Sequence, residues 1–250
     1  MFDREEIEQF ASAGFVIARG LLPEAARARM LAAAERDLAG AVQPLEYEAD
    51  LRYPGAPPSR EAPGGRTVRR LLQACARDAA FRDAATAPAI AGRLRQLLGP
   101  QVALAQAHHN CVMTKQPQYS SQTLWHRDIR YWSYHRPELV SAWFALGEEH
   151  AGNGGLMVLP GTQRIEFAAE RLDAAQFLRT DLAENQSLLD SRVEVGLAPG
   201  DVLFFHCRLF HAAGANSSDH IKFSPVFTYR ALDNLPLPGS RSAGLPDIYL

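Results

Sequence analysis

The feature that most constrains the fold is a change of hydrophobic periodicity at Gln101. Before this residue, apolar side chains recur every three to four positions, which is typical of amphipathic helices. After it, they occur in short runs separated by Gly, Pro, Asn and Asp, which is the pattern of short β-strands. Helices followed by a run of strands predict an α+β protein, mainly β, whose strands form a barrel or a double sheet such as a jelly roll.

Local signals give approximate bounds for these elements. Asp3 and Glu6 form a capping-box pattern that opens a helix ending near Gly14. Further helices are expected from Pro23 to Gly40, over 67–76 and over 88–98. Strands are expected over 15–18, 102–105, 111–113, 122–129, 140–146, 156–159, 193–195, 202–205 and 221–229.

The pattern predicts a single domain over residues 1–250. Residues 1–100 are expected to be mainly helical support, with a Pro- and Gly-rich loop over 42–66 that we interpret as a lid. Residues 101–232 would form the jelly-roll core, with a helical insertion near 168–185. Residues 233–250 are expected to be a C-terminal tail.

Composition excludes several classes of protein. Hydrophobic residues make up 47% of the 250 residues, which is too many for a disordered chain. The net charge of −2 and the lack of a basic patch argue against a nucleic-acid partner, and no apolar run approaches the roughly 18 residues of a membrane span. The first six residues are charged, unlike a signal peptide. Three scattered cysteines, Cys75, Cys111 and Cys207, favour reduced thiols and therefore a cytoplasmic protein.

The strongest candidate for chemistry is the pair His126 and Asp128. Residues i and i+2 of a strand point to the same face, so both side chains reach one point while Arg127 faces away. A third ligand must come from another strand, and both His206 and His211 are candidates; a turn of small residues follows His211 and lets a pocket approach it. Two imidazoles and one carboxylate form the facial triad of non-haem Fe(II) oxygenases, which leaves coordination positions for a 2-oxo acid and O₂. Taken alone, His-x-Asp also fits a hydrogen-bonded polar pair.

A second candidate lies after His211, where Lys222 and Ser224 alternate onto one strand face. A cation and a hydroxyl together suit the far carboxylate of a 2-oxo diacid. Arg230 shares this parity, but eight strand residues span roughly 26 Å, too far for the same pocket. The alternative is that Lys222 is an ordinary surface lysine.

Together these motifs resemble the phytanoyl-CoA dioxygenase family over nearly the whole chain. The segments that carry the resemblance are Gly14–Ile17, Trp125–Asp128 followed by Tyr131 and Trp132, Trp143–Leu146, Gly152–Leu156, Leu159–Gln163, and Pro199–Phe205 followed by His211 and Asn216.

The resemblance implies a double-stranded β-helix (jelly roll, cupin-like) core with the N-terminal helices packed on it. It implies an enzyme that uses Fe(II), 2-oxoglutarate and O₂ to oxidise a small organic substrate, most simply by hydroxylation, with release of succinate and CO₂. Its iron ligands would be His126, Asp128 and His211. The 2-oxoglutarate site would comprise Lys222, where the family usually has Arg, with Ser224 and Trp143; the substrate-pocket candidates are Trp132, Tyr131 and Arg127.

Several alternatives stay open at this point. The same fold supports desaturation and cyclisation, and a related halogenase lacks the carboxylate ligand that Asp128 supplies. A non-catalytic jelly roll that binds a metal or small molecule and a zinc hydrolase are the other classes, because one fold hosts many functions. The sequence leaves the substrate and the oligomeric state open.

Overall fold

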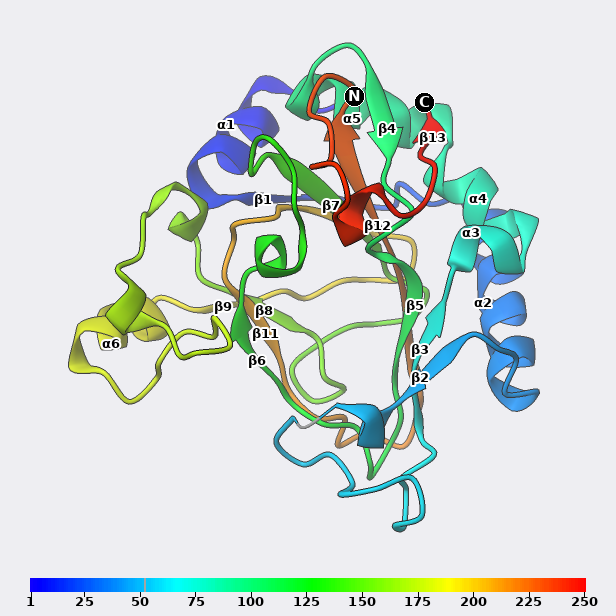
Figure 1. Cartoon of the computed structure of the whole chain (residues 1–250). Coiled ribbons are helices and arrows are strands. Elements are labelled where there is room, and N and C mark those ends of the chain that lie inside the picture. Colours follow the sequence, from blue (N-terminus) through cyan, green and yellow to red (C-terminus); the bar gives the residue numbers. More distant parts are fainter. Residues whose placement is uncertain (52) are drawn as a thin grey trace.

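Two antiparallel sheets that share one apolar core form the centre of the molecule in the computed structural model, which describes residues 1–51 and 53–250 (Figure 1). Seven strands of the larger, nine-stranded sheet follow the spatial order β1 (Phe15–Ala18), β10 (Val202–His206), β7 (Leu139–Phe144), β12 (Lys222–Ala231), β5 (Asn110–Lys115), β3 (Val68–Leu72) and β2 (Leu45–Tyr47). Its remaining strands are β4 (Val102–Leu104), which pairs with β12, and β13 (Ile248–Tyr249), which pairs with β4.

The smaller sheet has four strands in the order β6 (Thr123–His126), β11 (His211–Ala213), β8 (Leu156–Val158) and β9 (Val193–Glu194). Neighbouring strands in both sheets run antiparallel. Two antiparallel sheets closed over one core are the arrangement of a jelly roll, so the predicted fold class is confirmed.

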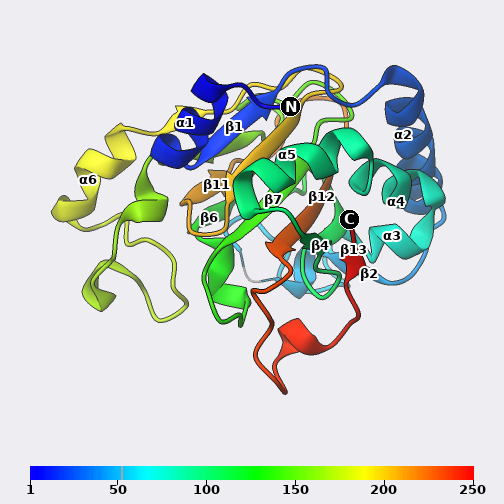
Figure 2. The ribbon, with the colours of Figure 1, turned by 90° about the horizontal axis from the view of Figure 1, so that it is seen from above.

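Helices cover the outer face of the larger sheet, where α2, α3 and α5 contact its strands (Figures 1 and 2). The α-helices are α1 (Arg4–Ala13), α2 (Glu24–Ala39), α3 (Ala74–Arg77), α4 (Ala79–Ala85), α5 (Pro88–Leu98) and α6 (Ala183–Asp190). Short 3-10 helices are η1 (Glu48–Asp50), η2 (Asp128–Tyr131), η3 (Thr162–Arg164), η4 (Ala169–Arg171) and η5 (Arg241–Ala243). Within the described part of the chain, no helix combines the length and apolarity needed to cross a membrane.

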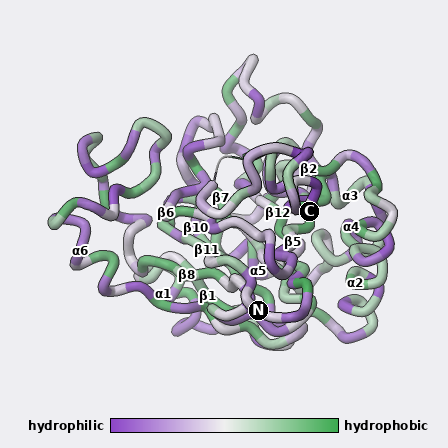
Figure 3. Tube along the Cα trace, turned by 90° about the horizontal axis from the view of Figure 1, so that it is seen from below, coloured by the Kyte–Doolittle hydropathy of each residue, from purple (hydrophilic) through white to green (hydrophobic). Residues whose placement is uncertain are grey.

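The apolar core has two layers. One lies between the larger sheet and the helices and contains Phe81, Phe144 and Phe227. The other lies between the two sheets and contains side chains such as Trp143 and Leu156. Hydrophobic residues make up strands such as β8, whereas many outer loops are hydrophilic (Figure 3). The inner layer matters for function because it surrounds the space between the sheets.

Phe227 gives a direct test of the outer layer. Its side chain is fully buried, and its ring lies 5.7 Å from the Phe144 ring in an edge-to-face arrangement. Replacing a buried phenylalanine by alanine removes apolar burial and leaves a cavity, so Phe227→Ala should lower the free energy of unfolding in urea by about 3–5 kcal/mol. Leu235→Ala, at a position 52% exposed, is the control and should change it by less than about 0.5 kcal/mol. Equal losses in the two variants would contradict the placement of Phe227 in the outer layer of the core.

Of two element predictions in the first hundred residues, one is confirmed and one is wrong. The capping box is confirmed, because the Glu6 main-chain N–H donates to Asp3 and the Asp3 N–H donates to Glu6, and the helix ends at Gly14 with a positive φ of 85°. The helix predicted over 67–76 is wrong, because Val68–Leu72 is strand β3 and only the residues after Gln73 are helical. Gln73 has a φ of 57°, a left-handed conformation that separates the strand from α3.

The other segments depart less from expectation. The loop 42–66 contains β2 and η1 between its turns, apart from residue 52, which lies outside the described residues. The helix predicted near 168–185 is wrong for most of that range, which is irregular apart from η4, because α6 starts only at Ala183. The tail 233–250 is tied to the sheet by β13 and by an ion pair between Asp247 and Arg230. Arg230 therefore serves a different place from Lys222, as its distance along β12 predicted.

Candidate metal centre

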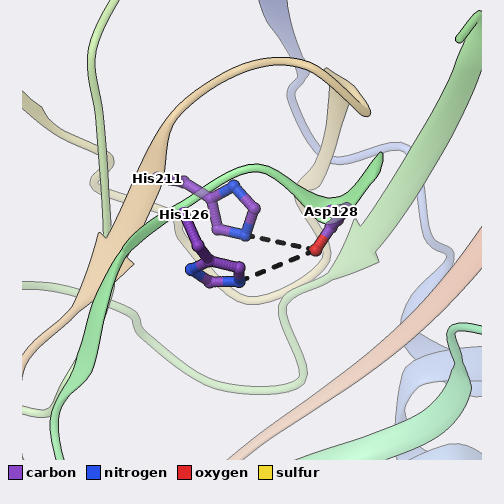
Figure 4. Close-up of side chains that lie close together, drawn as sticks. All are labelled: His126, Asp128 and His211. Carbon is purple, nitrogen blue, oxygen red and sulfur yellow. Dashed lines mark ion pairs between the residues drawn. The ribbon is translucent and has the colours of Figure 1, made fainter. Parts of the chain in front are cut away.

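His126 and His211 are brought together by the smaller sheet, where they are direct register partners on β6 and β11. Their ring centroids lie 4.3 Å apart. The Nε2 atoms of His126 and His211 lie 3.7 Å and 3.6 Å from Oδ1 of Asp128 (Figure 4). The three side chains are buried, and their candidate ligand atoms all lie within 4.8 Å of one another.

Main-chain carbonyls orient both imidazoles. Nδ1 of His126 lies 2.8 Å from the carbonyl oxygen of Leu124, and Nδ1 of His211 lies 3.1 Å from that of Leu209. A carbonyl only accepts, so each Nδ1 carries the hydrogen, and the Nε2 lone pair is directed at the centre of the site. Burial lowers the pKa of His126 to about 3, so its ring is neutral at pH 7, the form that binds a metal ion.

Asp128 supplies the negative charge of the site. Its side chain is fully buried, and neither carboxylate oxygen has a hydrogen-bond partner among the described residues. Burial alone would raise the pKa of Asp128, but the neighbouring histidines, led by His109, lower it below its ordinary value. A buried, ionised carboxylate without a partner is costly, and a cation between it and two free Nε2 atoms removes that cost. The donor set therefore fits a divalent metal ion of the kind bound by a facial triad.

The local structure differs from the prediction in one respect. Strand β6 ends at His126, and Asp128 is the first residue of η2, so the predicted strand over 122–129 is too long. Arg127 between them is still extended, with φ −113° and ψ 135°, which preserves the alternation that directs both neighbours inward. His206, the other candidate ligand, ends β10, and its Nδ1 accepts a hydrogen bond from the Arg208 N–H, away from the cluster.

A cavity of about 260 Å³ adjoins this cluster between the two sheets. The predicted pocket residues Tyr131, Trp132, Trp143 and Lys222 line it. Arg127 does not belong to this lining, because its guanidinium stacks over the rings of Phe167 and Phe210 at 5.5 and 5.1 Å. Cationic, imidazole and aromatic side chains complete the wall, among them Tyr53, Arg69, Arg70, His108, Lys115 and Arg241.

The three predicted cosubstrate residues also cluster, but with an additional partner. The Lys222 ammonium lies 2.8 Å from Ser224 Oγ and 5.0 Å from the centre of the Trp143 ring. All three side chains donate to the carboxylate of Glu149, which sequence reasoning did not identify. Lys222 is thus a buried, ion-paired lysine and not a surface one.

Sequence reasoning also missed His109. Its Nδ1 lies 3.5 Å from Asp128 Oδ2, and its ring packs edge-on against Trp132. The signal available in the sequence was the pair His108–His109 directly before a strand. In the part of the chain that the structure describes, His109 is the imidazole nearest to the second oxygen of Asp128, which makes it a candidate to orient that carboxylate.

Comparison with known proteins decides the family. The family model described as "Phytanoyl-CoA dioxygenase (PhyH)" matches residues 10–224, which is most of the chain and includes all three clustered candidate ligands. The chain belongs to the phytanoyl-CoA dioxygenase family. The resemblance predicted from the sequence motifs is therefore confirmed.

Curated members of the family are distant relatives. The peroxisomal phytanoyl-CoA dioxygenase of Homo sapiens is 25% identical over 225 residues, covering 86% of this chain and 64% of that protein. The ectoine dioxygenase of Halomonas elongata is 26% identical over 189 residues, covering 69% of this chain and 56% of that protein. The chain thus spans less than two thirds of the length of these relatives.

Solved structures of this fold superpose closely. EctD from S. alaskensis, crystallised with 2-oxoglutarate and 5-hydroxyectoine, has a TM-score of 0.77 at 20% identity, covering 94% of this chain and 78% of that one. The epimerase SnoN, in complex with Fe3+, alpha ketoglutarate and nogalamycin RO, has a TM-score of 0.73 at 22% identity, covering 98% and 93%. At these identities the likeness establishes the fold.

Proposed function

We propose that this member of the phytanoyl-CoA dioxygenase family is a non-haem Fe(II) dioxygenase that uses 2-oxoglutarate and O₂ to oxidise a small organic substrate, with release of succinate and CO₂. The observation that carries the proposal is the buried carboxylate of Asp128, which lies between two imidazole Nε2 atoms and accepts no hydrogen bond from any described residue. Family membership supports the same activity.

The chain's own residues would hold and shield this chemistry. Once bound, a ferrous ion chelated by a 2-oxo acid supplies the power to oxidise a C–H bond. His126, Asp128 and His211 would hold the metal on one side only, which leaves the cavity side open. Tyr131 and Trp132 would present their rings to the substrate, because both line the cavity beside Asp128.

The loop 42–66, which we interpret as a lid, and the insertion near 168–185 both reach this region. Tyr53, from the loop 42–66, packs edge-on against Phe177, from the insertion, with ring centroids 5.9 Å apart. Phe177 in turn lies 6.0 Å from the His126 ring, and the Tyr53 hydroxyl lies 3.3 Å from that of Tyr131. These contacts support a role for the two segments in excluding water from the metal site.

Hydroxylation is the reaction we propose, although the fold supports others. Relatives named ectoine dioxygenase and phytanoyl-CoA dioxygenase are oxygenases by name, whereas the similar structures include one titled an epimerase and one titled a carbocyclase. Desaturation or cyclisation is therefore the second candidate. Asp128 disfavours a halogenase, because its carboxylate fills the position that a halide would need.

The proposal also covers the cellular compartment of the protein and its binding partners. Cys75, Cys111 and Cys207 are all free thiols, which supports the predicted reducing, cytoplasmic compartment. The human relative is named peroxisomal, so location within the cell stays a prediction. The expected partner is a small-molecule substrate.

A coupled assay tests this function. Iron-loaded protein incubated with 2-oxoglutarate and O₂ should release succinate, and a panel of small organic substrates should include one that accelerates this release. Under anaerobic conditions, Fe(II) with 2-oxoglutarate should give a weak visible absorption band. A protein that binds a metal yet gives neither band nor succinate would be a non-catalytic binding protein, and hydrolysis with zinc alone would indicate a zinc hydrolase.

A further inference from the structure

A carboxylate of the chain itself occupies the cluster that was predicted to bind the cosubstrate. Oε2 of Glu149 lies 3.1 Å from the Lys222 ammonium, and Oε1 accepts a hydrogen bond of 2.7 Å from the Ser224 hydroxyl. The indole N–H of Trp143 lies 3.0 Å from both oxygens. The Glu149 side chain is fully buried, and that of Lys222 is 2% exposed. Glu149 therefore uses the donors that the far carboxylate of a 2-oxo diacid would need.

The charges of Lys222 and Glu149 decide how this cluster would receive a second carboxylate. Lys222 and Glu149 form a neutral pair in a place with almost no access to water. A second carboxylate brought to Lys222 would lie close to that of Glu149, and two buried like charges at short range repel strongly. Without Glu149, the same carboxylate would meet an uncompensated ammonium, a hydroxyl and an indole N–H, all of which stabilise it.

The main chain also restrains Glu149. Its N–H donates to the carbonyl of Leu197 at 2.9 Å, and its carbonyl accepts from the Leu197 N–H at 3.0 Å. Lys222 is fixed by its pairing with Lys115 across β12 and β5. With both main chains fixed in this way, Lys222 would be released by rotation of the Glu149 or the Lys222 side chain.

The neighbouring lysine is a weak substitute. Lys115 lines the cavity, but its ammonium already donates to the main-chain carbonyls of Ser121 and Gly214, at 2.5 and 2.7 Å. Burial lowers the pKa of Lys115 to about 7, so near neutral pH it carries only part of a positive charge.

We propose that Glu149 determines which 2-oxo acid this chain accepts: by neutralising Lys222, it removes the preference for a second carboxylate. This inference rests on the proposed function, in which a 2-oxo acid is the cosubstrate. Under it, 2-oxoglutarate and a 2-oxo acid with a single carboxylate bind with similar affinity. Freeing Lys222 from its internal partner restores a charge-assisted anchor, which is worth about tenfold or more in affinity for the diacid alone.

Anaerobic titration of the iron-loaded protein, followed by the visible band, measures this preference without turnover. For the unmodified protein, the Kd values of 2-oxoglutarate and 2-oxobutyrate should differ by less than about tenfold, since the anchor that separates them is neutralised. A preference for 2-oxoglutarate above that value would overturn the inference, and this measurement depends on no variant. A protein that binds iron but gives no band with either acid would overturn the proposed function, and the inference with it.

Glu149→Gln then tests the residue itself. The amide keeps the shape of the side chain and an acceptor for Trp143 or Ser224 but removes the charge. The Kd of 2-oxoglutarate should fall by about tenfold or more, while that of 2-oxobutyrate should stay within about twofold. Glu148→Gln is the matched control, because Glu148 is the exposed neighbour, and it should leave both Kd values unchanged. If Glu149→Gln weakened 2-oxoglutarate binding or left it unchanged, Glu149 would be only a structural support for Lys222.

Discussion

Replacing Asp128 by alanine should abolish cosubstrate turnover and lower the affinity for Fe(II) by more than about a hundredfold. Loss of a residue that merely hydrogen-bonds to a metal ligand already lowers metal affinity by up to about a hundredfold, and loss of a ligand itself should cost more. The reason is that Asp128 provides the only carboxylate in the cluster of three candidate ligands, and both of its oxygens are buried without a partner in the described structure. Iron binding is measured by anaerobic titration, and turnover by succinate release.

The stability of the metal-free protein gives an independent readout of the same variant. Alanine removes a buried carboxylate that has no hydrogen-bond partner among the described residues, so the melting temperature of the metal-free Asp128→Ala protein should be equal to or higher than that of the unmodified protein. Added Fe(II) should raise the melting temperature of the unmodified protein, because a ligand that binds the folded state stabilises it, but not that of the variant. Asp233→Ala is the control, since the Asp233 carboxylate is 76% exposed and pairs with Arg136. Unchanged iron binding in Asp128→Ala would exclude this residue as a ligand.

Arg69→Met should lower the free energy of unfolding by about 3–5 kcal/mol, because it breaks a buried ion pair. Arg69 and Glu48 form an ion pair at 3.1 Å whose side chains are 5% and 0% exposed. The guanidinium also donates to Ser121 and to Thr123, at 2.6 and 2.8 Å. Methionine would leave the Glu48 carboxylate buried without its counter-charge. Urea unfolding of the metal-free protein measures the loss.

Arg69 joins the loop 42–66, through Glu48, to the strand that carries the first candidate metal ligand, through Thr123. Glu48 belongs to η1 in the loop, whereas Thr123 begins β6, which ends at His126. Arg60→Met is the matched control, because Arg60 pairs with Asp50 in the same loop but is 53% exposed. Exposed pairs contribute little, so this control should lose less than about 1 kcal/mol. Similar losses in Arg69→Met and Arg60→Met would mean that burial of the pair has no special effect.

The same ion pairs explain why one strand escaped sequence reasoning. In β3, Arg69 and Arg70 are adjacent charged residues, and their sequence neighbourhood has the spacing of an amphipathic helix. Both are accommodated in the sheet because carboxylates from the loop pair with them, Glu48 with Arg69 and Glu46 with Arg70. Such partners are distant in sequence and leave no periodic signal, so only the tertiary structure reveals the strand.

The metal cluster was more accessible to prediction because its geometry is largely local. His126 and Asp128 depend on the alternation of an extended segment, which survives even though the strand ends at His126. The position of His211 opposite His126 depends on strand pairing between distant segments, which the spacing alone did not determine. Family resemblance, rather than periodicity, selected His211 over His206.

Glu149, in contrast to the metal cluster, could not be predicted from local sequence. Lys222 and Ser224 were found by alternation along one strand, and Trp143 by its motif, but their shared partner lies in the turn after β7. A glutamate in a segment rich in glycine reads as solvent-exposed, since glutamate is seldom fully buried without a partner. The pairing of Glu149 with Lys222 therefore became apparent only when the fold brought β7 and β12 together.

The most direct test of the account is anomalous diffraction at the iron edge, from crystals grown anaerobically with Fe(II). The proposed metal centre should give one peak per chain on the order of 2 Å from Nε2 of His126, Nε2 of His211 and a carboxylate oxygen of Asp128, the usual range for such bonds. The absence of such a peak at the cluster, or a peak that lies next to other side chains instead, would contradict the proposed metal centre.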